Sequence, residues 1–479
     1  MIEDLKPYPE YKDSGLPWLG KVPAHWGIER AKRLFLKMNR ASRPEDDVVT
    51  CFRDGTVTLR KKRRTSGYTE AIFEHGYQGV RRGDLVISGM DAFAGAIGVS
   101  DSDGKSSPVY SVCLPQEDAN SHYYAHLLRR MAHSEWILAL AKGIRERSTD
   151  FRFDVFGAQR LPLPPVAEQA AIARFLAWAS NRLDRAIGAK RRIIALLQDQ
   201  KQAIIHQAVT RGLDPSVPLK DSGIPWLGKI PEHWEVRRLR TVVKTIDQGV
   251  SPLATGFLAE GNSWGVLKSG CVNRGVFRET EHKQLSQSFK IDSSIVVKPG
   301  DVLISRACGS PSLVGSVGRV GKLHYNLILS DKTFRPNFEE SVDVDFMVLA
   351  MNSTYYRRQV EQAISGAEGM ANNLPISSLR DFSLAIPPLD EAKAIAFSIN
   401  KRLAGINLAI ASNEQEITLL REYRTRLIAD VVTGNLDVRE AAAGLPEEIE
   451  PPIQSDAAGY DGDEAEDDSD SDPIDTEED

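Results

Sequence analysis

The chain has 479 residues, enough for about three domains of ordinary size. Its 42% hydrophobic and 26% charged residues are typical of a globular protein, and no apolar run approaches the roughly 20 residues that span a bilayer. The start, MIEDLKPYPEYK, lacks the features of a secretory signal, so we expect a cytoplasmic protein. The four cysteines include no C-x-x-C pair, which favours free thiols over a zinc ribbon or a disulfide framework.

Charge is distributed unevenly along the chain. Seventeen of the 66 acidic residues follow Arg439 and no Lys or Arg does, which leaves 60 basic against 49 acidic side chains, a net charge of +11, in the preceding part. A moderately basic body suits a polyanionic partner.

The chain repeats one pattern of organisation twice. Residues 12–34 (KDSGLPWLGKVPAHWGIERAKRL) match residues 220–239 (KDSGIPWLGKIPEHWEVRRL), and Leu161–Asp214 matches Leu384–Asp437 without gaps. Between these matches the halves diverge and share only short segments, such as GDLVIS in the first half and GDVLIS in the second. A shared frame with divergent filling indicates a scaffold that holds two interchangeable readers, and duplication with drift is the alternative.

Residues 1–163 are predicted to form a first domain, a mixed β-rich globule. Short runs of Val, Ile, Thr and Phe broken by Gly and Asp indicate strands, and a helix is expected at Tyr123–Ala141. The domain is rich in basic side chains, which we expect to contact DNA phosphates and release counterions. The candidate DNA-binding residues here are Arg60, Lys61, Lys62, Arg63, Arg64, Thr65, Tyr68, Arg81, Arg82, Arg145, Arg147 and Arg152.

Residues 164–212 are predicted to form a long central helix. Two prolines, Pro164 and Pro165, mark its start, and Glu168 lies in the first turn, where negative charge suits the helix dipole. Apolar residues then recur with a heptad period, which is typical of a coiled coil.

Residues 213–386 are predicted to form a second mixed β-rich globule, with a helix at Asp345–Ile364. Arginine can bond bidentately to guanine edges, and asparagine or glutamine to adenine edges, whereas phosphate contacts only position a protein on DNA. The candidate DNA-binding residues of this globule are Lys244, Gln248, Lys268, Asn273, Arg306, Lys332, Asn372 and Asn373.

Residues 387–438 are predicted to form a second long helix, with Glu391 in its first turn and a stronger heptad pattern. Neither long helix can bury its apolar stripe alone. The economical solution is that the two pair with each other in antiparallel orientation, and pairing with a different protein is the alternative. Residues 439–479 are predicted to be a disordered acidic tail, either a solubilising appendage, a docking tail or a competitor for the basic surface.

A search for catalytic motifs finds none. The repeated GLPWLGK and GIPWLGK match the first seven positions of a phosphate-binding loop, but Val22 and Ile230 replace the magnesium-binding hydroxyl. Neither a dinucleotide fingerprint nor an amino-methyltransferase motif is present. His25 and His233 recur in the repeated P-x-H-W unit, where a histidine beside tryptophan more often packs than acts as a base. We therefore assign no catalytic residue, no metal site and no cofactor to this chain.

Together these motifs resemble those of the specificity (S) subunits of Type I restriction-modification enzymes. The resemblance rests on the SGxPWLGxxPxHW unit, the PPxxEQ or PPxxEA helix start, the TRGLD and TGNLD ends and the GDLVIS or GDVLIS segment, and it covers residues 8–438. It implies an α+β fold, in which two target recognition domains in a pseudo-twofold arrangement are joined by two long antiparallel coiled-coil helices.

The resemblance also implies a function. A specificity subunit is non-catalytic and reads a bipartite target in double-stranded DNA, and its helices set the unread spacer and dock two DNA methyltransferase (modification) subunits. Restriction/translocase subunits join that assembly, and S-adenosylmethionine, ATP and magnesium are expected on the partners. The alternatives are a coiled-coil scaffold without sequence-specific DNA reading and, less favoured by the missing motifs, a methyltransferase or nuclease.

Overall fold

The chain separates into two compact units, described here one by one. The first comprises residues 1–190 and 415–479, and the second residues 191–414. The structure is a computed structural model that describes residues 5–63, 76–140, 151–273, 275–364 and 372–446. Within these ranges no helix is both long enough and apolar enough to cross a bilayer.

The core of unit 1 is a four-stranded antiparallel sheet with the order β4-β11-β8-β9. The central strand β8 is the LVIS segment of GDLVIS, and all four of its residues are buried. The helix α3 (Ser121–His133) packs against β8 and β9 with a buried face that includes Leu127 and Met131. The strands of this sheet are β4 (Phe35–Lys37), β8 (Leu85–Ser88), β9 (Ile97–Val99) and β11 (Tyr110–Pro115).

Unit 2 contains an antiparallel sheet of the same topology, in the order β16-β25-β21-β23. Its buried strand β21 is the VLIS segment of GDVLIS, which occupies the same place in this sheet as β8 does in the first. One sheet topology therefore persists where the two halves of the sequence diverge. The strands are β16 (Val243–Gln248), β21 (Val302–Ser305), β23 (Val317–Arg319) and β25 (Thr333–Phe338), followed by the helices α7 (Val344–Ala350) and α8 (Thr354–Ala363).

The units differ in the strands added around these sheets. Unit 1 adds two antiparallel pairs, formed by β5 (Val49–Cys51) with β6 (Val57–Leu59) and by β7 (Gln78–Val80) with β10 (Gly104–Ser106). Unit 2 adds a three-stranded sheet and two short pairs. These comprise β17 (Trp264–Leu267), β20 (His282–Gln284), β24 (Asn326–Ile328), β18 (Val272–Asn273), β19 (Val276–Phe277), β22 (Ala307–Cys308) and β26 (Asn372–Asn373).

The repeated segments form a frame that is alike in both units. A short hairpin opens each copy, and we call residues 11–26 and 219–234 entry hairpins 1 and 2. Each continues into a strand that pairs with the strand leading to a long helix. The frame strands are β1 (Tyr11–Asp13), β2 (Lys21–Pro23), β3 (Gly27–Arg30) and β12 (Arg160–Leu163) in unit 1, and β13 (Leu219–Asp221), β14 (Lys229–Pro231), β15 (Glu235–Arg238) and β27 (Ser383–Ile386) in unit 2.

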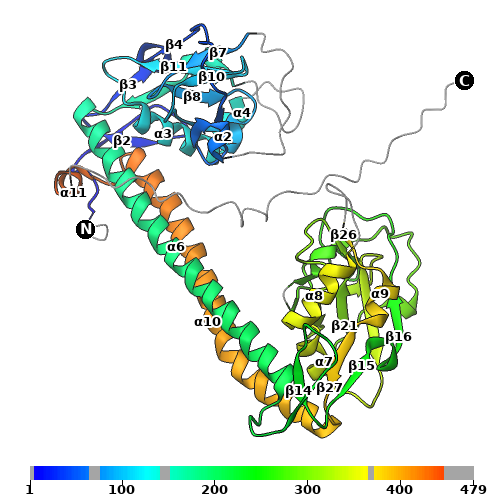
Figure 1. Ribbon diagram of the computed structural model, residues 1–479. Helices are drawn as coiled ribbons and strands as arrows, with labels where there is room; N and C mark the ends of the chain where they lie inside the picture. Colours follow the sequence, from blue (N-terminus) through cyan, green and yellow to red (C-terminus); the bar gives the residue numbers. More distant parts are fainter. Residues whose placement is uncertain (1–4, 64–75, 141–150, 274, 365–371, 447–479) are drawn as a thin grey trace, which may run out of the picture. The chain divides into compact units, whose positions relative to one another are not determined.

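The two long helices are α6 (Val166–Arg211) and α10 (Leu389–Val432), and they lie side by side (Figure 1). Each begins directly after its Pro-Pro pair, as the sequence predicts. In unit 1 the Lys190 ammonium lies 2.6 Å from the Glu416 carboxylate, and in unit 2 Lys201 donates to the Asn407 side chain at 2.9 Å. In unit 1, Asp184 lies earlier in α6 than Lys190 and binds Arg424, which lies later in α10 than Glu416, so the paired segments of this unit are antiparallel.

The chain beyond α10 folds back onto unit 1. The amide of Asp437 donates to the carbonyl of Lys6 at 2.8 Å, and the short helix α11 (Arg439–Ala443) follows. Ala442 and Leu445 are buried in the core of the unit. The sequence analysis assigned residues 439–446 to a disordered tail, and this part of the prediction is wrong, because the apolar side chains of Ala442 and Leu445 pack into the core of unit 1. Residues 447–479 of the predicted acidic tail lie outside the described residues.

A partly buried histidine on α3 predicts a pH dependence. Burial first, and then the positive charges of Arg129 and His122, together lower the pKa of His126 to about 4. An unfolded chain takes up this proton near pH 6.5, so unit 1 is expected to lose stability as the pH falls from about 6.5 toward 4. Denaturant unfolding at pH 7 and pH 5 should show that the free energy of unfolding falls less between these pH values in His126→Asn than in the unmodified protein. Equal losses in both would contradict this assignment.

Candidate nucleic-acid interface

In unit 1 a single carboxylate joins the entry hairpin to the long helix. Glu168, whose side chain is 4% exposed, accepts hydrogen bonds from the Tyr8 hydroxyl at 2.5 Å, from His25 Nε2 at 2.8 Å and from Trp26 Nε1 at 2.9 Å. Burial raises the pKa of Tyr8, and the bond to Glu168 raises it further, so its hydroxyl stays a donor. This contact fixes the start of α6 against the globule.

Unit 2 repeats this contact in a weaker form. The carboxylate of Glu391, 31% exposed, accepts from His233 Nε2 at 2.7 Å and from Trp234 Nε1 at 3.1 Å. Ser216 stands where the first copy has Tyr8, and its hydroxyl bonds to Asp214 instead. The histidines of the P-x-H-W units therefore pack against carboxylates and hold the frame, in agreement with the packing interpretation of the sequence.

Three of the residues predicted to bind DNA in unit 2 meet at one edge of its sheet. The carbonyl oxygen of Asp331 accepts from Gln248 Nε2 at 3.0 Å and from Arg306 Nη1 at 2.8 Å. The exposed Lys332 follows directly, and its carbonyl accepts the amide of Arg306 at 2.8 Å. We call Gln248, Arg306, Asp331 and Lys332 the Asp331 edge.

The remaining unit 2 candidates lie at or beside the Asp331 edge, in β18, or at the other end of β16. Asn372 and Asn373 form β26, which pairs with the strand that follows Arg306, so they extend the Asp331 edge. Lys268 lies beside that edge, because the carbonyl of the next residue, Ser269, accepts a hydrogen bond from the Ser305 hydroxyl. The Lys268 ammonium lies 3.9 Å from the Glu281 carboxylate. Asn273 lies in β18, and its buried Oδ1 has no partner among the described residues. Lys244 lies at the other end of β16, paired with Glu340.

The basic run of unit 1 begins with a short helix, α2 (Arg60–Arg63), and acidic side chains surround it. Lys61 pairs with Asp47, Lys62 lies 3.7 Å from Asp101, and Arg63 lies 2.6 Å from Asp54. The Arg60 side chain donates to Thr50 at 3.2 Å. The positive potential of this run is therefore smaller than its sequence implies.

The other unit 1 candidates have different environments. Arg81 is mostly buried and binds Asp46 at 3.1 Å and the carbonyls of Val80 and Gly104, whereas Arg82 is exposed. The exposed Arg152 follows Phe151, whose amide donates to Gly89 just beyond β8, at the opposite end of that strand from Arg81. The structure thus separates Arg152 from the other described candidates. Arg64, Thr65, Tyr68, Arg145 and Arg147 lie outside the described residues.

Two arginines that the sequence analysis did not single out hold the shared GD segments. Asp84 binds Arg40, and Asp301 binds Arg335 at 3.2 Å. Each aspartate also accepts the backbone amide three residues before it, at 2.7 Å in unit 1 and 2.9 Å in unit 2. The GD segment is therefore a turn closed by its own carboxylate and neutralised by an arginine from elsewhere in the unit.

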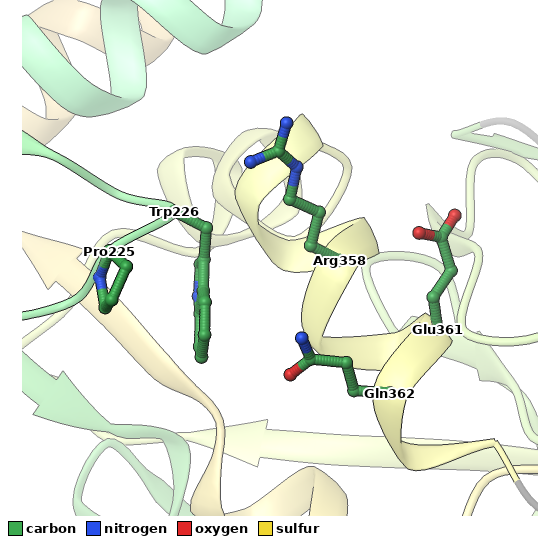
Figure 2. Close-up of a pocket in the computed structure, with 5 residues that line it drawn as sticks. All are labelled: Pro225, Trp226, Arg358, Glu361 and Gln362. Carbon is green, nitrogen blue, oxygen red and sulfur yellow. The ribbon is translucent and has the colours of Figure 1, made fainter.

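Entry hairpin 2 also borders a shallow hollow of about 350 Å³ (Figure 2). Pro225 and Trp226 form one side, and Arg358, Glu361 and Gln362 of α8 form the other. The indole Nε1 of Trp226 has no hydrogen-bond partner within the described part of the chain. This hollow lies between entry hairpin 2 and α8 and includes none of the residues predicted to bind DNA.

The cysteines are free thiols, as predicted. Cys51, Cys113 and Cys271 are buried and Cys308 is partly exposed. Burial raises the pKa of Cys271 to about 12, which keeps this thiol protonated at neutral pH. No group of three potential metal-binding side chains is found in the described ranges.

Comparison with known proteins finds similar chains. This chain is 26% identical over 289 residues to the Type I restriction enzyme MjaVIII specificity subunit of Methanocaldococcus jannaschii, a match that covers 60% of this chain and 64% of that protein. It is 24% identical over 441 residues to the putative MjaX specificity subunit of the same organism, covering 88% and 96%. No family model matches the chain.

A solved structure shares the fold. A chain from a structure that addresses complex assembly and conformational transition of the type I R-M system matches with a TM-score of 0.55 at 17% identity, covering 87% of this chain and 99% of that one. The fold of this chain is mixed α+β, with the long helices α6 and α10. The sequence match spans 64% of the MjaVIII subunit and 33% of the EcoEI specificity subunit of Escherichia coli, less than two thirds of either relative.

Proposed function

Because the chain belongs to the family of specificity subunits of Type I restriction-modification enzymes, we propose that it reads a bipartite target in double-stranded DNA. Unit 1 would read one half of the target and unit 2 the other, with α6 and α10 setting the unread spacer. Specificity subunits carry no catalytic activity of their own, and methylation and cleavage belong to their partners.

The observation that carries this proposal is that one frame occurs in both units while the predicted DNA-binding residues of the two units differ. Both units contain a sheet of the same topology. In both, a glutamate at the start of the long helix, Glu168 or Glu391, binds the tryptophan of an entry hairpin. The predicted DNA-binding residues of the two units differ: the described ones of unit 1 are all Arg or Lys, whereas those of unit 2 also include Asn and Gln. A protein that presents one type of domain twice with different contact residues is built to recognise two different sequences with one docking geometry.

Within each unit the predicted DNA-binding residues receive different roles. The Asp331 edge, with Asn372 and Asn373, is proposed to read base edges, because it gathers amide and guanidinium donors. Lys244, Lys268 and the basic side chains of α2 are proposed to contact phosphates, with their aspartate and glutamate partners exchanged for the backbone of DNA. Arg82 and Arg152 are proposed as further contacts of unit 1 with DNA.

The partners are proposed to be two methyltransferase subunits and the restriction/translocase subunits that join them. Two copies of one partner require two similar surfaces, and the exposed faces of the entry hairpins provide them. Exposed residues of entry hairpin 1, among them Lys12, Pro17 and Lys21, have identical exposed counterparts in entry hairpin 2. S-adenosylmethionine, ATP and magnesium are proposed to bind to these partners.

Methylome sequencing tests this proposal. Cells that carry this chain with its methyltransferase subunit should show methylation at one two-part motif, and cells that lack this chain should not. A scaffold that does not read DNA, the alternative function, predicts an unchanged methylome when the chain is removed.

A further inference from the structure

An exposed apolar loop rises from the Asp331 edge of unit 2. It comprises residues 250–258, is separated from β16 by Gly249, and contains no charged side chain. Leu253 is 87% exposed and Phe257 is 77% exposed, and Val250 and Leu258 are also exposed. Large apolar side chains exposed side by side in a chain segment mark a binding surface more often than chance exposure does.

The backbone of this loop is held in place along its length. The amide of Thr255 donates to the carbonyl of Gln284 at 2.8 Å, and the amide of Gln284 donates to the carbonyl of Phe257 at 2.8 Å. The amide of Ala259 donates to Nε2 of the buried His282 at 2.9 Å. The loop therefore presents Leu253 and Phe257 from a fixed backbone, which lowers the entropy lost when they bind.

The loop is continuous with the residues proposed to read DNA. Its first carbonyl, that of Val250, accepts the amide of Asp331 at 3.2 Å, and the carbonyl of Asp331 in turn binds Gln248 and Arg306. Just before the loop, the backbone at position 249 lies close to the backbone of Leu329. This position requires glycine, because a Cβ there would lie 2.0 Å from the carbonyl oxygen of Leu329. Cationic and amide groups thus lie at the base of an uncharged apolar tip.

We propose that Leu253 and Phe257 form an apolar wedge that enters the stacked bases of the half-site read by unit 2. Proteins that bend DNA insert Phe and Leu between base pairs, unstack one step and kink the duplex. The polar groups of the Asp331 edge would hold the adjacent base edges and phosphates. Such a wedge adds specificity through the deformability of the step that it opens. This inference rests on the proposed function.

The test uses the full chain assembled with its methyltransferase subunits and a duplex that carries the motif found by methylome sequencing. The double variant Leu253→Ser/Phe257→Ser should bind this duplex at least tenfold more weakly. Its slope of log affinity against log salt should equal that of the unmodified protein, because an apolar contact releases no counterions. Lys268→Gln, which removes a proposed phosphate contact, should in contrast make the slope shallower by about one unit.

Two readouts separate insertion from other roles. With 2-aminopurine at successive positions of the unit 2 half-site, the unmodified complex should increase fluorescence at one step, and the double variant should not. Phe257→Leu, which keeps an apolar tip, should retain most of the affinity. The exposed Val276→Ser, elsewhere in unit 2, should leave both affinity and fluorescence unchanged.

Three results would overturn the wedge. Unchanged affinity and fluorescence in the double variant would show that the loop does not enter DNA. Loss of assembly with the methyltransferase subunits at unchanged DNA affinity would assign the loop to a protein partner. An unmodified complex that fails to distinguish the motif duplex from a scrambled one would refute the proposed function, and the wedge with it.

Discussion

Replacing Glu168 with alanine is expected to destabilise unit 1 by about 3–5 kcal/mol. The substitution removes the shared acceptor of Tyr8, His25 and Trp26, and the indole of Trp26 is fully buried. Hydrogen bonds to a charged acceptor contribute about 1.5–3 kcal/mol each, and a buried donor left without a partner costs about 1–3 kcal/mol. Hydrogen exchange of unit 1 peptides measures the loss directly, because it reports each unit separately.

The second copy supplies a matched control. Glu391→Ala removes only two hydrogen bonds from a carboxylate that water partly reaches, so we expect a loss of about 1–2 kcal/mol, confined to unit 2. Glu168→Gln keeps one acceptor oxygen and should fall between the unmodified protein and Glu168→Ala. Equal effects of Glu168→Ala and Glu391→Ala would contradict the greater importance assigned to the buried contact.

Arg335→Met is expected to destabilise unit 2 by about 3–5 kcal/mol, the usual cost of removing one partner from a buried ion pair. The Arg335 side chain is 11% exposed and binds Asp247 at 2.8 Å, Asp301 at 3.2 Å and the carbonyls of two further residues. Burial raises the pKa of Asp247, but hydrogen bonds from Arg335 and Asn337 outweigh that effect and leave it below the ordinary value. Methionine leaves both carboxylates without their cation.

An exposed ion pair in the same unit gives the comparison. Arg238 lies 3.3 Å from Asp381, and both side chains are 54% exposed. Because water screens this pair, and Arg240 also binds Asp381, Arg238→Met should cost less than about 1 kcal/mol. Denaturant unfolding followed by hydrogen exchange of β21 and β25 distinguishes the two variants. Similar losses for both would show that Arg335 does not neutralise the GD turn.

Local patterns in the sequence were sufficient to predict the long helices and the β-rich character of both globules. The Pro-Pro pairs and heptads act within a few residues, so α6 and α10 begin where those patterns place them. The strand order could not be predicted, because β4 pairs with β11, more than 70 residues away, and no local signal encodes that partner. The common topology of the two sheets is visible only in the structure.

The candidate site was predicted less well, for the same reason. The basic run at Arg60–Arg63 suggested a strong positive surface, but Asp47, Asp54 and Asp101 reach it from other segments. Glu168 was assigned to the helix dipole, whereas its main contacts are with the entry hairpin. The joint recurrence of His-Trp and of the helix-start glutamate in both copies was the signal that could have revealed this pair.

One departure between the copies has a structural explanation. Gln169 is fully buried and binds the carbonyls of Asp118 and Pro164 and the amide of Asn120, which holds the start of α3. The second copy has Ala392 at this position. There Gln359, from α8, instead binds both the amide and the carbonyl of Ser383 in β27. Each unit therefore ties its helical layer to its frame through a different glutamine.

The most direct test of two independent readers is an exchange of one of them. Residues 1–160 would be replaced by the corresponding residues of a specificity subunit with a different target, and the methylome of cells carrying the hybrid and its methyltransferase subunit would be sequenced. The account predicts a motif in which one half is new and the other half, read by unit 2, is unchanged. A motif that changes in both halves, or in neither, would contradict it.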